Sequence, residues 1–388
     1  MRPLFTRTLN IVWVINLGFI ISYTAFNILL PLYIQEAGFG EGTNGFILGT
    51  AQLGMFATML LLGPSIDRGD PRRFIFGGAL LYSLASVMLI FLPPSGVLLT
   101  AGRFLQGVAF ASFYTANVVY ITRSTPDALR GTVVGLSEAV AATAITLAPF
   151  PATWLHARSG YGAAFAAAGA CAFLVSVLIR LLPAPPPRQG VLPTVRGFHP
   201  LTMRAVLPGL VASSLFFAAT GYISMQPVIA GALGLQSISI YFAVRALCTV
   251  PTRFLSGIIA DRVGGAWAIV PGYLLAALGL MLLPVLRQPG WVYLTPVLFG
   301  LGMGIASPAL THWMLGRVDR AEHAVAINTL SLMAQLSGFG GTWMAGTILQ
   351  AGHMPGVPLA AALLAGLALF GWRQLKTPTA ELKKVPSI

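Results

Sequence analysis

The sequence predicts an all-helical, polytopic membrane protein whose twelve transmembrane helices form two pseudo-symmetric six-helix bundles. Three observations predict this class. Charged residues make up only 9% of the 388 residues and hydrophobic residues 56%, so there are too few charges to cover a soluble surface. Apolar stretches of about 20 residues, the length that crosses about 30 Å of hydrocarbon, recur along the chain. One short sequence pattern also recurs half a chain apart.

The apolar stretches divide into two sets of six. Each can satisfy its own backbone hydrogen bonds as a helix, which a segment in lipid must do. The first set is predicted at 10–34, 45–66, 74–92, 96–121, 132–155 and 160–182, and the second at 205–230, 237–260, 266–286, 291–315, 323–350 and 355–374. The proline-rich stretch 183–203 between them cannot span and is predicted to be a cytoplasmic linker. The predicted domains are therefore 1–182 and 204–388, the second ending in a short cytoplasmic tail.

Basic residues are distributed unevenly between the connections. With the N-terminus in the cytoplasm, nearly all Lys and Arg residues outside the spans fall on the cytoplasmic side, and only Arg158 and Arg287 fall on the other. By the positive-inside rule, both termini are predicted to be cytoplasmic. The net charge of +13 is thus a topology signal, and no nucleic-acid partner is predicted. The lack of Asn-x-Ser/Thr sequons fits a bacterial inner membrane.

The ends of the second and eighth predicted spans carry a similar sequence. Residues 63–68 read Gly-Pro-Ser-Ile-Asp-Arg, and residues 257–262 read Gly-Ile-Ile-Ala-Asp-Arg. Because the two copies lie half a chain apart, they indicate a duplicated six-helix unit.

These patterns resemble the major facilitator superfamily of secondary transporters, and in particular its efflux-type twelve-helix branch. That family carries Gly-x-x-x-Asp-Arg-x-Gly and two basic residues between its second and third helices, and the stretch 63–73 matches most of this motif. An Arg followed by Gln-Gly in the fourth helix appears as Arg103, Gln106 and Gly107, and the Arg-Gly that opens the fifth helix as Arg130 and Gly131. The Gly-Pro-x-x-Gly-Gly pattern of proton antiporters keeps only Pro149.

The resemblance implies two bundles that rock around a central cavity, which opens alternately to each side of the membrane. It also implies that the loop between the second and third helices is a latch, made in one state and broken in the other. The predicted latch residues are Gly63, Asp67, Arg68, Arg72, Arg130, Asp261 and Arg262. The alternative is a surface loop whose charges only set the topology.

Ionisable residues inside the predicted spans are few, and each is a functional candidate because charge is costly in a membrane. Glu138 is the one acid placed well inside a span, and it is predicted to carry a proton. The alternative is a structural carboxylate that bonds a neighbouring helix or reaches the surface. The family resemblance gives Arg103 a part in proton movement. Arg103 lies toward the other end of its helix, so the two side chains are not expected to pair.

Polar side chains at helical spacing are predicted to face protein or a water-filled path, because lipid would leave them unsatisfied. Arg245 has no acid within reach on its own helix, which favours contact with an anionic substrate group. Arg253 is predicted to brace the loop that holds Asp261. The predicted substrate-binding residues are Asn16, Tyr23, Asn27, Gln106, Tyr114, Asn117, Thr220, Ser224, Tyr241, Arg245, Asn328 and Gln335.

The sequence predicts no metal site, cofactor or enzymatic activity, because it lacks metal-ligand spacings, Cys-x-x-Cys pairs and Walker patterns. The predicted function is secondary active export of a small organic molecule by alternating access, coupled to antiport of protons. The protein is predicted to be a monomer surrounded by lipid. One alternative is proton-coupled or facilitated uptake of a small organic anion. Another, from a different class, is a sensor that has a transporter fold and does not transport.

Overall fold

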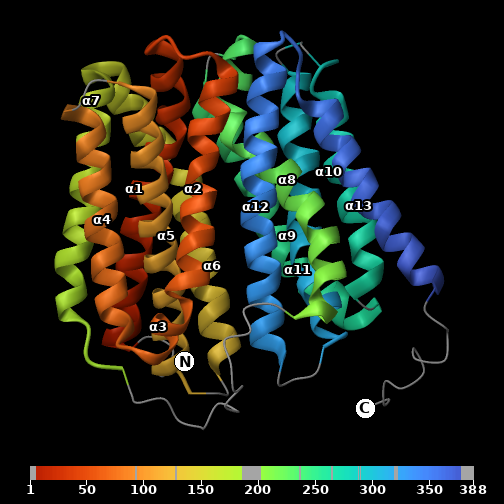
Figure 1. Cartoon of the computed structure of the whole chain (residues 1–388), viewed down its shortest axis with the longest axis horizontal. Coiled ribbons are helices and arrows are strands. Elements are labelled where there is room, and N and C mark those ends of the chain that lie inside the picture. The colour runs from red at the N-terminus through yellow and green to blue at the C-terminus, as the bar shows by residue number, and fades with distance from the viewer. Residues whose placement is uncertain are drawn as a thin grey trace.

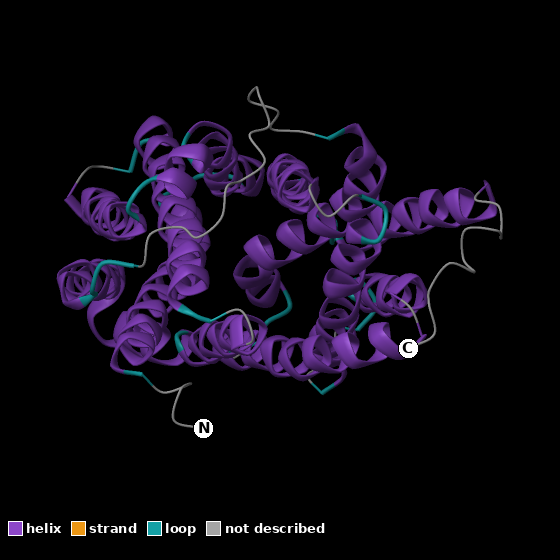
Figure 2. Ribbon diagram, turned by 90° about the horizontal axis from the view of Figure 1, so that it is seen from below, coloured by secondary structure: helices purple, strands orange, loops and turns teal. Residues whose placement is uncertain are grey.

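The computed structural model describes residues 6–91, 94–126, 129–185, 202–235, 237–263, 265–286, 288, 290–318 and 322–376. All regular secondary structure in these residues is helical (Figure 2). Most of the helices run along one common direction (Figure 1). Seven of the described helical segments are long and apolar enough to cross a membrane by length and composition. These features confirm the predicted all-helical, polytopic class.

The first half of the chain contains the helices α1 to α7. Four predicted spans correspond to α1 (Arg7–Glu36), α2 (Glu41–Leu61), α4 (Pro71–Phe91) and α5 (Gly96–Ser124). The fifth and sixth predicted spans correspond to α6 (Arg130–Leu147) and α7 (Pro149–Leu178). The break between these two helices lies inside the fifth predicted span, not at its end. The turn between these spans lies within α7 at Gly160, whose φ of 75° glycine adopts without strain.

The Gly63–Arg68 stretch is not the end of the second span, as the sequence pattern predicted. It forms a separate short helix, α3 (Gly63–Arg68), with a proline in its first turn. Pro64 lacks a backbone N–H and its ring clashes with the preceding turn, so it favours the start of a helix over the interior of α2.

The second half holds six long helices, as predicted. They are α8 (Met203–Ala232), α9 (Ile238–Val263), α10 (Gly265–Leu282), α11 (Leu294–Leu315), α12 (His323–Gln350) and α13 (Gly356–Lys376). Most of the predicted linker 183–203 lies outside the described residues.

The helices join two ends that differ in charge. The start of α1 and the short helix α3 lie at one end, at the bottom of Figure 1. We name it the basic end because it carries Arg7, Arg68, Arg72, Arg73, Arg123, Arg180, Arg204 and Arg317. The opposite end, named the distal end, carries Glu36, Glu41 and Gln350.

In the described part of the chain, the apolar core joins the two halves near the distal end. One buried cluster unites Phe26, Leu30 and Ile47 of the first half with residues from α8 to α13. A second buried cluster contains Leu9, Ile75 and other residues closer to the basic end, all of them from the first half. Among the described residues, apolar packing therefore closes the distal end and joins no first-half residue of the basic-end cluster to the second half.

Helix pairs that cross between the halves are α2 with α12, α6 with α9, and α1 with α8. The helices α2 and α12 lie side by side in Figure 1. At their crossing a Cβ on Gly45 would lie 2.6 Å from the Thr342 carbonyl oxygen and 3.0 Å from the Gly346 Cα. Only glycine allows so close an approach of two backbones. The Gly42 amide also donates to Gln350 Oε1 at 2.8 Å.

Candidate functional site

Glu138 on α6 links three helices and both halves of the chain. The Tyr114 hydroxyl of α5 donates to Glu138 Oε1 at 2.5 Å, and Arg253 Nη1 of α9 lies 3.3 Å from Glu138 Oε2. We name these three residues the carboxylate bridge. The sequence predicted a different role for Arg253, as a brace for the Asp261 loop; the structure gives it Glu138 as its partner because α6 and α9 pack together.

The carboxylate bridge lies inside the membrane-spanning region, and its two charged side chains are only partly buried. Glu138 is eight residues from the start of α6 and Arg253 ten residues from the end of α9, which places both about 12–15 Å from the basic end. The exposed fractions of their side chains are 36% and 48%. An ion pair with this exposure contributes roughly 0–1 kcal/mol, so the two halves can separate here at small cost.

Aromatic rings extend the bridge toward the middle of the first half. Tyr114 stacks on Phe110 with ring centroids 5.7 Å apart, and Phe110 lies 4.3 Å from Tyr23 of α1. The helical stripe predicted on α5 is therefore continuous with the predicted stripe on α1. In the described part of the chain, the side chain of Asn27 donates to the Tyr23 carbonyl of its own helix.

Arg103 on α5 is buried without an acidic partner among the described residues. Its side chain is 4% exposed, Nη1 donates to Gln106 Oε1 at 2.9 Å, and Nη2 donates to the Leu48 carbonyl at 3.4 Å. Its Nε is buried and has no hydrogen-bond partner in the described part of the chain. Gln106 in turn donates to Ser86 Oγ at 3.1 Å. As expected, Arg103 and Glu138 do not pair.

Arg245 on α9 is the counterpart of Arg103 in the second half. It is 8% exposed, and its Nε donates to Gln226 Oε1 of α8 at 3.0 Å. Its guanidinium carbon lies 5.7 Å from the centroid of the Phe242 ring. Within the described residues Arg245 has no carboxylate partner, so none of its donors binds an anion. Tyr241, buried beside it, accepts a hydrogen bond from the Tyr222 hydroxyl at 2.9 Å.

The two buried arginines lie at matching depth. Arg103 is seven residues from the distal start of α5, and Arg245 is seven residues from the distal start of α9. At 1.5 Å per residue both are about 10 Å below the distal end. Each half of the chain thus places one guanidinium without a carboxylate at the same level.

Several other predicted substrate-binding residues hold helices together. Asn16 of α1 donates to the Ser137 carbonyl of α6 at 3.2 Å. Thr220 bonds its own helix and packs against Gly338 of α12. Asn117 is buried, whereas Ser224, Asn328 and Gln335 are half-buried. Contact of these residues with substrate stays a prediction.

The predicted latch loop is held by residues of the first half. Arg123 at the end of α5 donates to the carbonyl oxygens of Asp67 and Gly69, the second at 3.0 Å. Arg72 pairs with Asp70 at 2.8 Å, and its hydrogen bond holds the pKa of the Asp70 carboxyl below its usual range. Gly63 has open space beside it, and Asp67 and Arg68 are exposed. The side chains of Arg130, Asp261 and Arg262 lie outside the described residues.

The sequence profile of the Major Facilitator Superfamily matches residues 12–342 and 210–385 of the chain, which together include both halves. The chain belongs to the Major Facilitator Superfamily. This membership agrees with the sequence resemblance and makes the chain a membrane transporter rather than an enzyme.

Relatives of the chain carry names that refer to different activities. An uncharacterized MFS-type transporter, YhhS of Escherichia coli, is 25% identical over 380 residues, which cover 92% of this chain and 90% of that protein. A cis,cis-muconate transport protein of Acinetobacter baylyi is 29% identical over 180 residues, 44% of this chain and 42% of that one. The multidrug resistance protein MdtL of Klebsiella pneumoniae is 25% identical over 206 residues, 52% of each chain.

Solved structures share the fold of this transporter. The POT family transporter PepTSo has a TM-score of 0.77 at 13% identity, covering 96% of this chain and 99% of that one. A bacterial homologue of the lysosomal transporter Spinster, in an inward-facing and unoccupied conformation, has a TM-score of 0.73 at 18% identity, covering 97% and 96%. At these identities the likeness concerns the fold alone.

Two residues of the site were not among the predicted site residues. Gln226 accepts from Arg245, although the sequence pattern singled out Thr220 and Ser224 on the same helix. The sequence signal that could have identified Gln226 is its polar side chain between Met225 and Pro227 in an apolar run. The sequence predicts Arg253 only as a brace for the Asp261 loop, because its partner on α6 is 115 residues away and no local pattern identifies it.

Proposed function

We propose that this transporter moves small organic anions and couples their movement to protons, with Glu138 as the proton carrier. Arg103 and Arg245 attract the anionic group of the substrate. The carboxylate bridge is the observation that supports the proposal most directly, because it joins the candidate proton carrier to the opposite half of the chain.

The balance of intramembrane charge favours an anionic substrate. Among the described residues, the charged side chains well inside the spans are Arg103, Glu138, Arg245 and Arg253. Glu138 compensates Arg253, which leaves Arg103 and Arg245 without a counter-charge. Buried positive charge in a membrane is costly unless it is paired, and a substrate carboxylate can supply the missing partner.

The bridge supports a simple form of coupling. While the halves are in contact at α6 and α9, the Arg253 guanidinium stabilises the Glu138 carboxylate. When the halves rock apart, Glu138 loses this cation and keeps only the Tyr114 hydroxyl, so a proton can take the place of Arg253. Protonation would then accompany each separation of the two halves.

The orientation follows from the same charges. By the positive-inside rule we assign the basic end to the cytoplasm. We further propose that the protein lies in the inner membrane of a bacterium and acts as a monomer. The apolar packing at the distal end then corresponds to closure on the outer side. Proton-driven export remains the predicted direction, with uptake of the anion as its alternative. The relative named for cis,cis-muconate transport supports an organic anion as the substrate.

The test uses purified protein in proteoliposomes that contain a pH-sensitive dye. Carboxylates of different size, namely cis,cis-muconate, succinate and benzoate, are added from either side, and tetraphenylphosphonium serves as the cationic comparison. At least one carboxylate is expected to drive a pH change that requires the protein, and the side of addition reports the direction. If tetraphenylphosphonium drives a pH change and none of the carboxylates does, the proposal is wrong.

A further inference from the structure

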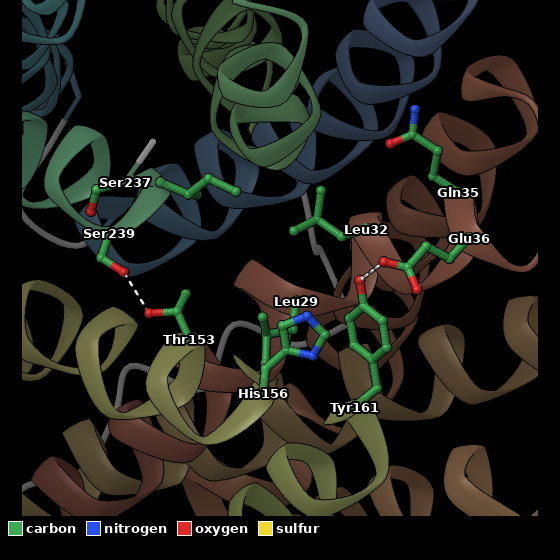
Figure 3. Close-up of a pocket in the computed structure, with 10 residues that line it drawn as sticks. Leu29, Leu32, Gln35, Glu36, Thr153, His156, Tyr161, Ser237 and Ser239 are labelled. Carbon is green, nitrogen blue, oxygen red and sulfur yellow. Dashed lines mark hydrogen bonds between the residues drawn. The ribbon is translucent and has the colours of Figure 1, made fainter. Parts of the chain in front are cut away.

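A cavity of about 380 Å³ opens at the distal end, between the two halves of the chain (Figure 3). Three helices supply its walls: α1 contributes Leu32 and Glu36, α7 contributes His156 and Tyr161, and α9 contributes Ile238 and Ser239. We name it the distal pocket. It contains none of the carboxylate-bridge residues and neither of the two buried arginines.

The distal pocket carries one unbalanced negative charge. Glu36 is the only Asp, Glu, Lys or Arg among its lining residues, and its Oε1 accepts a hydrogen bond from the Tyr161 hydroxyl at 2.7 Å. Its Oε2 has no hydrogen-bond partner within the described residues. No salt bridge to Glu36 occurs among the described residues, and Arg158, three residues before Tyr161, stacks its guanidinium on Trp154, 4.4 Å from the ring centroid.

An aromatic corner lies beside this carboxylate. The rings of His156 and Tyr161 are 4.0 Å apart, and Tyr161 is held from behind by Tyr33 and Phe165, at 5.4 and 5.9 Å. A tyrosine ring fixed next to a carboxylate attracts an organic cation through its face while the carboxylate pairs with the charge. Leu32 and Ile238 supply the apolar surface that a compact hydrocarbon body would cover.

We propose that the distal pocket binds a small organic cation, a protonated primary amine with a compact apolar body, whose ammonium group pairs with Glu36. An anionic ligand would be repelled by the same carboxylate. A metal ion is a poor alternative, since the described residues hold no group of three His, Cys, Asp or Glu side chains able to ligate one.

The position of the pocket gives such a ligand a second effect. In its wall Thr153 Oγ1 of α7 lies 2.8 Å from Ser239 Oγ of α9, and the Ser239 hydroxyl is 3.2 Å from the Pro149 carbonyl oxygen. A ligand that touches α1, α7 and α9 together therefore binds only while the distal end is closed. By linkage it stabilises the closed arrangement, whatever the transported substrate is.

The experiment measures binding of phenethylammonium to the purified full-length protein at pH 8 by isothermal titration and thermal shift. Phenethyl alcohol, the neutral analogue, and 3-phenylpropionate, the anionic one, are the comparison ligands. Saturable binding of the ammonium compound is expected, with at least tenfold weaker binding of both analogues. Equal binding of the alcohol, or no binding of the ammonium compound, would overturn the proposal.

Two variants locate the site. Glu36→Gln keeps the size of the side chain and its bond from Tyr161, and is expected to weaken phenethylammonium binding at least tenfold. Leu32→Trp fills the pocket and is expected to abolish binding. Glu41→Gln, an acid at the same end that does not line the pocket, is the matched control and should bind within twofold of the natural protein. Unchanged affinity in both pocket variants, each with the gel-filtration profile of the natural protein, places the ligand elsewhere and refutes the proposal.

Discussion

Glu138 and Arg253 lie 3.3 Å apart although 115 residues and the boundary between the two halves separate them. The pair lies between helices that must move relative to one another if the halves rock. The same carboxylate also accepts from Tyr114 in its own half, so it remains hydrogen-bonded when Arg253 withdraws. This asymmetry, one partner that stays and one that leaves, makes Glu138 the natural place to test proton coupling.

Glu138→Gln is expected to abolish proton movement while preserving binding of the transported anion. Glutamine can still accept from Tyr114, but it cannot exchange a proton or pair with Arg253. Substrate-driven pH change in proteoliposomes should fall at least about tenfold, as expected when an intramembrane carboxylate carries the proton. Glu41→Gln, at the membrane surface, is the matched control. Full proton-coupled flux through Glu138→Gln would show that the carrier lies elsewhere.

Arg245→Gln is expected to weaken binding of the transported carboxylate by about tenfold or more, because one charge-assisted hydrogen bond is lost. Arg245→Lys should recover only part of the affinity. Lysine keeps the charge but lacks the planar guanidinium that can donate to Gln226 and to a carboxylate at the same time. Affinity is measured by titration with the best carboxylate of the flux screen. Arg180→Gln, at the basic end, is the control. Equal affinity in Arg245→Gln and the control would exclude Arg245 from the binding site.

Gly346→Leu is expected to shift the transporter away from the distal-closed arrangement. A Cβ at this position would collide with the Glu41 carbonyl and with Gly45 of α2. The readout is a disulfide between Thr153→Cys and Ser239→Cys, whose oxygens are 2.8 Å apart in the natural protein, after Cys171 and Cys248 are replaced by serine. Cross-linking should be fast with glycine at 346 and slow with leucine.

The control for this cross-linking experiment is Gly77→Leu, because a Cβ on Gly77 meets nothing within 4 Å. It should cross-link at the rate of the parent double-cysteine protein. If Gly346→Leu also cross-links at that rate, the α2–α12 crossing does not control closure of the distal end.

Arg123→Gln is expected to loosen the loop that holds Asp67. Its guanidinium donates to two backbone carbonyls of that loop, and each such bond contributes roughly 0.5–1.5 kcal/mol. Hydrogen exchange should become faster over residues 63–73 and stay unchanged at the distal end. Arg73→Gln, an exposed arginine of the same loop, is the comparison. Equal protection of the loop in the two variants would rule out Arg123 as its anchor.

Much of this architecture can be predicted from the sequence, because a segment that crosses lipid must meet strict physical requirements. A span must be apolar, about 20 residues long and helical, so the six long helices of the second half and most helices of the first appear directly as apolar stretches. The exceptions are positions where proline and glycine act locally. Pro64 separates α3 from α2, and Gly160 places a turn inside α7.

The candidate site required the tertiary structure. The sequence singled out Glu138, Arg103 and Arg245 because charges are rare inside spans, but it could not assign their partners. Helical periodicity states which residues share a face of one helix, whereas partners such as Arg253 and Gln226 depend on how helices distant in sequence are packed and rotated. The distal pocket likewise exists only where α1, α7 and α9 meet. Apolar length decided which segments are helices in the membrane, and packing between those helices decided which polar atoms meet.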